Sequence, residues 1–228
     1  MKEQRVFPKR GVLHYVSDDK LIYSLNEKLF YDSDAKKFIL SLEVRPNFDI
    51  LNRIFRRGIH KVIENGSFIF VIINTQIQIV CTNSQRVVST HSLRGNRPLV
   101  IEKFRDGIVY GEYSGNKHRK DMTIVYVDRF GVSRTLASIP GIRHIHSITE
   151  MEYSRKYIVT TGDEDHESKI MLFDENFHDH RIIAEGTQNF RVVQPIVRKN
   201  YLYFGTDMPD SENHIYKIDL STGVSRQL

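Results

Sequence analysis

The chain has 228 residues, of which 40% are hydrophobic and 27% charged, so it can bury a core of ordinary size. No apolar run is long enough to cross a bilayer, and the charged start lacks the apolar stretch of a secretory signal. A single cysteine, Cys81, cannot form an internal disulfide, so we expect a reducing, cytoplasmic setting. The net charge of +5 favours anionic partners. The basic residues are spread along the chain and form no continuous stripe, which argues against nucleic acid as the partner.

Short segments rich in β-branched and aromatic residues follow one another, each bounded by turn residues. They cover residues 68–80, 107–113, 123–128, 156–161 and 200–207. One further segment, 47–57, has apolar residues at helical spacing and predicts a helical connector. Because strands dominate and no helices alternate with them, the sequence predicts an all-β fold.

A repeat of about 45 to 50 residues runs along the chain, close to the length of one four-stranded propeller blade. Segments 123–136, 169–183 and 214–228 each contain an apolar strand, an aspartate, a turn and a second strand. The repeated aspartates are Asp128, Asp174 and Asp219, at intervals of 46 and 45 residues. Fainter copies occupy 28–40 and 77–88.

The repeat predicts a single β-propeller domain over residues 1–228, with about five four-stranded blades. The expected blades span approximately 6–42, 57–92, 97–137, 144–184 and 191–228. Five blades could close a ring alone, or the chain could supply part of a larger ring. The repeat leaves both arrangements open.

The turn in "YVDRFGVSRTL" resembles a worn Asp box of the sialidase-type (BNR-repeat) propellers, with Asp128 and Gly131 near the expected places but no tryptophan after them. The stretch 143–216 is also similar to sialidase-like propellers from bacterial polysaccharide gene clusters. This resemblance implies a propeller fold and a glycan as ligand. Sialidase chemistry would further require an arginine triad, a tyrosine–glutamate pair and an acid/base aspartate, and no motif here identifies the tyrosine–glutamate pair.

Polar side chains recur where the first strand of a blade starts and where the second ends, and these two points share one edge of an antiparallel sheet. The strand starts carry Arg57, Arg97, Arg143, His144, His146, Arg191 and Gln194, and the strand ends carry Glu112, Asp163 and Asp207. Because a guanidinium binds carboxylate or sulfate through two hydrogen bonds, we expect the four arginines, with His144, Gln194 and Asp207, to bind an acidic substrate. The alternative is that the arginines pair with acidic loops of adjacent blades.

His144 and His146 are two positions apart on a strand, so their side chains should point the same way. With His60 and Gln194 nearby, they could hold Mn²⁺ or Zn²⁺, as in a metal-dependent polyuronate lyase with a propeller fold. We favour hydrogen bonds to neighbouring carboxylates instead, and we predict no metal or other cofactor. Asp163 and Asp207 recur at the end of the second strand, which favours a role in shaping turns over a role in catalysis.

We therefore expect a carbohydrate-active or carbohydrate-binding propeller for an anionic glycan or other acidic small ligand, without a membrane partner. In the enzymatic version, a sialidase-like glycoside hydrolase, His146 with Asp163 or Glu112 would transfer protons. The alternatives are a non-catalytic scaffold or recognition module and a metal-dependent polyuronate lyase-like enzyme. The sequence decides neither whether the protein is an enzyme nor its oligomeric state.

Overall fold

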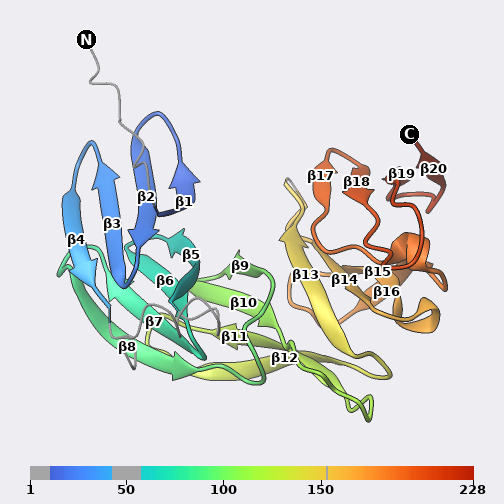
Figure 1. Ribbon diagram of the computed structural model, residues 1–228, viewed down its shortest axis with the longest axis horizontal. Helices are drawn as coiled ribbons and strands as arrows, with labels where there is room; N and C mark the ends of the chain where they lie inside the picture. Colours follow the sequence, from blue (N-terminus) through green and yellow to red (C-terminus); the bar gives the residue numbers. More distant parts are fainter. Residues whose placement is uncertain (1–10, 43–57, 153) are drawn as a thin grey trace. The chain divides into compact units, whose positions relative to one another are not determined.

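A computed structural model describes residues 11–42, 58–152 and 154–228 of the chain (Figure 1). The predicted connector at 47–57, including Arg57, lies outside these residues. The described residues form twenty strands and two short 3₁₀ turns, η1 (Asp165–Glu167) and η2 (Gln188–Phe190). No helix in this part of the chain is long and apolar enough to cross a membrane.

The strands form five sheets of four, which we call blades 1 to 5. Blade 1 contains β1 (Val12–Val16), β2 (Lys20–Leu25), β3 (Lys28–Ser33) and β4 (Lys37–Ser41). Blade 2 contains β5 (Ile59–Asn65), β6 (Phe68–Ile73), β7 (Gln76–Cys81) and β8 (Arg86–Ser92). Blade 3 contains β9 (Ile101–Phe104), β10 (Gly107–Gly111), β11 (Met122–Val127) and β12 (Ser133–Ile139). Blade 4 contains β13 (His144–Glu150), β14 (Tyr157–Gly162), β15 (Lys169–Phe173) and β16 (His180–Glu185). Blade 5 contains β17 (Ile196–Arg198), β18 (Tyr201–Gly205), β19 (Ile215–Asp219) and β20 (Ser225–Gln227).

Within every blade the strands follow the order of the chain, and each pairs antiparallel with the next. This order confirms the predicted repeat of four strands. Two first strands start later than predicted, at Ile101 in blade 3 and at Ile196 in blade 5. Pro98 and Pro195 explain the delay, because proline cannot donate a ladder hydrogen bond and constrains the residue before it.

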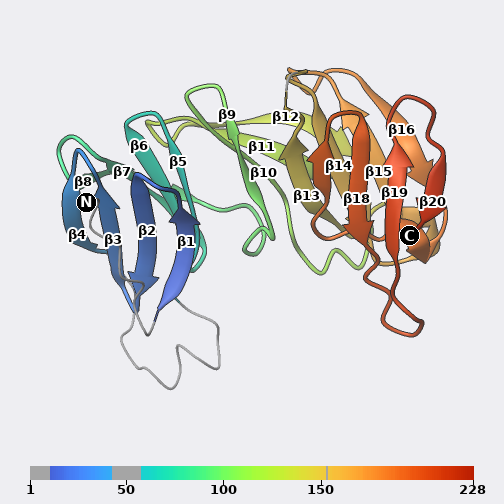
Figure 2. The same ribbon diagram turned by 90° about the horizontal axis from the view of Figure 1, so that it is seen from above.

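The chain divides into two compact units, whose strands are labelled in Figure 2. Unit 1 comprises residues 1–93 and 129–131, with blades 1 and 2, and unit 2 comprises 94–128 and 132–228, with blades 3 to 5. In blades 2 to 4 the second strands, β6, β10 and β14, are buried on both faces, and this explains their nearly continuous apolar sequences. The fourth strands, such as β8, are largely exposed.

The repeated aspartates organise the turns between third and fourth strands. A carboxylate oxygen of Asp128 accepts a hydrogen bond from the backbone N–H of Val132, at 2.9 Å. Asp174 and Asp219 accept equivalent backbone hydrogen bonds within their own turns. Such hydrogen bonds hold the chain in a turn, so the recurrence of these aspartates has a structural cause.

Candidate functional site

A β-bulge in β13 places one of the two histidines. The register of β13 against β14 shifts between Ile145 and Ser147, so His146 is an extra residue in its strand. The first strands of blades 1 and 2 shift at the same point of the repeat, at His14 and His60. A bulge redirects its side chain, so the regular alternation assumed from the sequence does not hold at His146.

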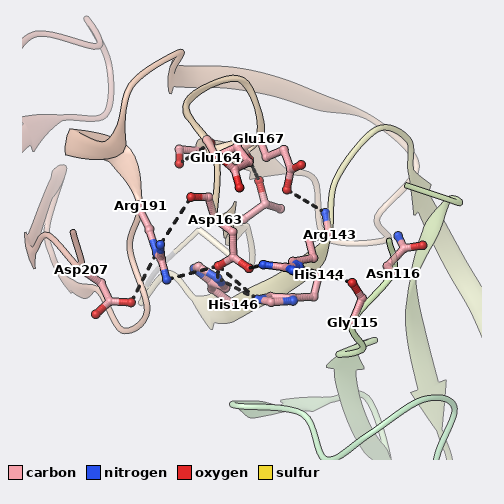
Figure 3. A network of polar contacts seen from close by, with 12 residues as sticks. Gly115, Asn116, Arg143, His144, His146, Asp163, Glu164, Glu167, Arg191 and Asp207 are labelled. Atoms are coloured by element: carbon pink, nitrogen blue, oxygen red, sulfur yellow. Dashed lines mark hydrogen bonds and ion pairs between the residues drawn. The ribbon is translucent and has the colours of Figure 1, made fainter. Parts of the chain in front are cut away.

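The side chains of His144 and His146 nevertheless converge, and both meet the carboxylate of Asp163 at the end of β14 (Figure 3). Their Nε2 atoms are 3.1 Å apart. Each Nε2 also lies 3.5 Å from Oδ1 of Asp163. Both histidines are buried, with exposed fractions of 6% and 2%. The structure therefore brings together three of the predicted site residues.

Backbone carbonyls determine which nitrogen carries the hydrogen in the two neutral rings. Nδ1 of His144 lies 3.2 Å from the carbonyl oxygen of Ser114, and Nδ1 of His146 lies 3.2 Å from that of Val192. A carbonyl oxygen only accepts hydrogen bonds, so each Nδ1 must carry the hydrogen. In the neutral rings, both Nε2 atoms therefore present lone pairs to one another and to Asp163.

Asp163 has an unusual backbone conformation, with φ of 141°, in the region that favours glycine. Such a conformation costs about 1–3 kcal/mol and persists only where the surroundings hold it. Here the side-chain amide of Gln188 donates to the Asp163 carbonyl at 2.6 Å, and Arg191 donates to the same oxygen at 3.3 Å. These contacts fix the loop that presents the carboxylate to the histidines.

Two arginines also hold the Asp163 carboxylate. Nη1 of Arg143 donates to Oδ2 at 2.9 Å, and Nη2 of Arg191 lies 3.3 Å from Oδ1. A ring that also carries a proton on Nε2 donates to Asp163, and such hydrogen bonds from His144 and His146, together with that from Arg143, hold the pKa of Asp163 far below its usual range. Asp163 is therefore a carboxylate at neutral pH and cannot donate a proton there.

A second buried carboxylate supports the loop. Glu167 is fully buried, accepts a hydrogen bond from the backbone N–H of Arg143 at 3.0 Å, and pairs with Arg119. Asp207, from blade 5, pairs with Arg191 at 3.4 Å. Arg143 thus pairs with a carboxylate of its own blade, whereas Arg191 pairs with Asp163 of the preceding blade and with Asp207 of its own.

Three further predicted residues, Glu112, Arg97 and Gln194, flank strands of blades 3 and 5. The carboxylate of Glu112 accepts the backbone N–H of Thr123 at 2.9 Å, within blade 3. Arg97 is half-buried before β9, and Gln194 is exposed before β17. Gln188 was not among the residues predicted from the sequence. Its contact to Asp163 joins residues 25 positions apart, so local patterns carry no signal for it.

No protein-family model matches the chain, and no curated protein matches it. Solved structures do match. A chain in the crystal structure of the mitotic checkpoint complex is 14% identical, with a TM-score of 0.63, over 94% of this chain and 61% of that one. A chain in the crystal structure of the tricorn protease is 13% identical, with a TM-score of 0.55, over 92% of this chain and 21% of that one. This chain therefore spans less than two thirds of either match, and identities this low carry information on fold alone.

With these matches, the five four-stranded antiparallel sheets establish the fold class. The described residues have an all-β propeller fold with five blades. Within unit 2 of this propeller, the site draws on three successive blades. The loop after β10 supplies Ser114, blade 4 supplies both histidines and Asp163, and the segment before β17 supplies Arg191 and Val192. Chemically, the site presents two imidazole lone pairs and an ionised carboxylate at its centre and guanidinium groups around them.

Proposed function

We propose that the protein binds an acidic carbohydrate at the edge of blade 4 in unit 2. The observation that carries the proposal is that the guanidinium of Arg143 is oriented, partly exposed and has a donor without a partner among the described residues. Its guanidinium is oriented by Asp163 and by the carbonyl oxygen of Gly115, which accepts from Nε at 3.3 Å, and its side chain is 37% exposed. Within the described residues, its Nη2 atom has no hydrogen-bond partner. An oriented guanidinium with a free donor suits a carboxylate or sulfate group.

An aromatic residue beside the site suits a sugar ring. The ring centroid of Tyr113 lies 4.1 Å from that of His144, and Tyr113 is half-buried. Contact with His144 holds the tyrosine ring in place, so its apolar face could pack against a pyranose without a large loss of side-chain freedom. An acidic sugar offers both a charged group for Arg143 and an apolar ring face. The resemblance of 143–216 to sialidase-like propellers points to the same ligand class.

The proposal is for binding rather than sialidase-like hydrolysis. A glycoside hydrolase needs a proton donor, and the lowered pKa of Asp163 keeps that group ionised. The carboxylate of Glu112 accepts a backbone hydrogen bond in its own blade, and His146 is 2% exposed. These observations favour a recognition module, in the reducing setting that the lone cysteine suggests, over an enzyme.

Isothermal titration calorimetry tests the proposal with oligogalacturonates, sialylated and sulfated oligosaccharides, and neutral oligosaccharides of equal length. We expect binding of at least one acidic class and none of the neutral sugars. Arg143→Ala should weaken that binding at least about tenfold, equivalent to about 1.4 kcal/mol. Arg198→Ala is the matched control, because Arg198 is an exposed arginine of the same unit, paired with Glu152 at 3.6 Å. Equal affinity of the Arg143→Ala protein and the wild type, or no acidic ligand at all, would refute the proposal.

A further inference from the structure

The three central atoms of the site form a nearly regular triangle. Its edges are 3.1 Å between the two Nε2 atoms and 3.5 Å from each Nε2 to Oδ1 of Asp163 (Figure 3). All three atoms are electron donors when the histidines are neutral. Three donor groups facing each other at this distance repel one another unless a cation or a proton lies between them.

The size of the triangle suits a small divalent ion. Its centre lies about 2 Å from each corner, within the range of Zn–N and Zn–O bonds. Ligands of a tetrahedral ion at about 2.1 Å lie about 3.4 Å apart, close to the three edges. An ion slightly above the plane of the triangle would therefore need little movement of the side chains.

The surroundings of the triangle are those of a preorganised metal site. A metal-binding histidine usually donates its other ring N–H to a carbonyl or carboxylate, which fixes the tautomer and the ring orientation. Here the Ser114 carbonyl does this for His144, and the Val192 carbonyl does it for His146. The Val192 carbonyl also accepts from the hydroxyl of Thr160 at 2.8 Å, which holds this carbonyl in place beside His146.

We propose that His144 and His146, through Nε2, and Asp163, through Oδ1, bind one divalent transition-metal ion. The three groups are the cluster of possible metal ligands in the described residues. Two imidazoles and one carboxylate suit Zn²⁺, Mn²⁺ or Co²⁺, whereas Ca²⁺ and Mg²⁺ prefer oxygen ligands alone. Three protein ligands leave at least one coordination position for water or an added ligand.

Two neighbouring arginines limit the affinity of the site for a divalent ion. Arg143 and Arg191 both contact the Asp163 carboxylate, and their charges oppose a second cation beside it. Asp207 offsets Arg191, and Glu164 of the same loop acts electrostatically on Arg143. We therefore expect a dissociation constant for Zn²⁺ in the micromolar rather than the nanomolar range. The competing occupant is a proton shared between the two Nε2 atoms.

The test uses the whole chain, stripped with a chelator and dialysed. Calorimetric titration with Zn²⁺, followed by elemental analysis after removal of free ion, should give one Zn²⁺ per chain. His146→Ala and Asp163→Asn should each weaken binding at least tenfold. The matched control is His118→Ala, because His118 is an exposed histidine in the loop that follows β10 of the same unit. It should bind as the wild type does.

A measurement on the wild type removes dependence on the folding of variants. Nitrogen NMR of the imidazoles should show two rings with hydrogen on Nδ1, and Zn²⁺ should shift their Nε2 resonances. One-to-one binding that survives His146→Ala, or a shared proton between the Nε2 atoms with no stoichiometric Zn²⁺, would overturn the proposal. No carbohydrate takes part in these measurements, so this proposal does not rest on the proposed function and can fail or stand independently of it.

Discussion

A Cβ atom at Gly162 would lie 2.9 Å from Cε1 of His146 and 3.1 Å from Cγ of Arg191. The glycine at the end of β14 therefore makes room for the imidazole of the bulged histidine. Because Gly162 is not among the residues with positive φ, the requirement is steric and not conformational. Any larger side chain at this position must displace His146, Arg191 or the strand itself.

Replacing Gly162 with alanine should destabilise unit 2 by about 1–3 kcal/mol, the usual cost of overpacking, and move His146 away from Asp163. Urea unfolding measures the first effect, and imidazole NMR measures the second. The control is Gly205→Ala, since Gly205 ends the second strand of blade 5 and a Cβ there meets nothing within 4 Å. Equal destabilisation of the two variants would contradict the steric explanation.

Asp163 should make the free energy of unfolding depend on pH in the acidic range. Its pKa in the folded protein lies well below the ordinary value of 3.8, chiefly because of His144 and His146. The ionised carboxylate therefore contributes stability fully above about pH 4, and this contribution falls as the pH drops below that value. Asp163→Asn should be less stable at pH 7 and should lose less stability than the wild type between about pH 4 and pH 2. Denaturant unfolding as a function of pH measures this. If the free energy of unfolding fell equally with pH in the wild type and in Asp163→Asn, the Asp163 carboxylate would not be the cause of the pH dependence.

Replacing Glu167 should lower the free energy of unfolding more than replacing an exposed glutamate. Its side chain is fully buried, and it serves both Arg119 and the backbone N–H of Arg143. Glu167→Gln should cost about 3 kcal/mol, because it leaves the Arg119 charge without its partner. Glu185→Gln is the comparison, since Glu185 is 49% exposed and pairs with Lys169 at 3.6 Å. It should change the free energy of unfolding by less than about 0.5 kcal/mol.

The turn aspartates should affect stability and leave ligand binding unchanged. Asp174 accepts backbone hydrogen bonds from His178 at 2.7 Å and Asp179 at 3.2 Å, so Asp174→Ala should cost about 1 kcal/mol. The neighbouring Glu175 is exposed, and Glu175→Ala should have almost no effect. Thermal unfolding of both variants compares them. A change in carbohydrate or metal affinity in Asp174→Ala would show that the turn is coupled to the site.

The blades were predictable because their causes are local. An apolar strand, an aspartate and a turn lie within about fifteen residues, and the aspartate accepts hydrogen bonds from backbone N–H groups two to five positions ahead. The delayed starts of β9 and β17 also have a local cause in Pro98 and Pro195, which the prediction did not take into account.

The site was predictable only in its location. Antiparallel pairing within a blade places the start of the first strand beside the end of the second, so His144 and Asp163 had to share an edge. The sequence could not show that the carboxylate of Asp163 would form ion pairs with both Arg143 and Arg191. That outcome depends on the backbone angle of Asp163 and on a loop from the next blade.

By itself, then, the sequence determined the four-strand repeat, the turns and the edge at which polar groups gather, because hydrogen bonding and apolar alternation act over short distances. The tertiary structure decided what those groups do. It set the bulge at His146, the tautomers of both rings and the pairing of the arginines, because these depend on contacts such as Val192 to His146, 46 residues apart, that no local pattern encodes.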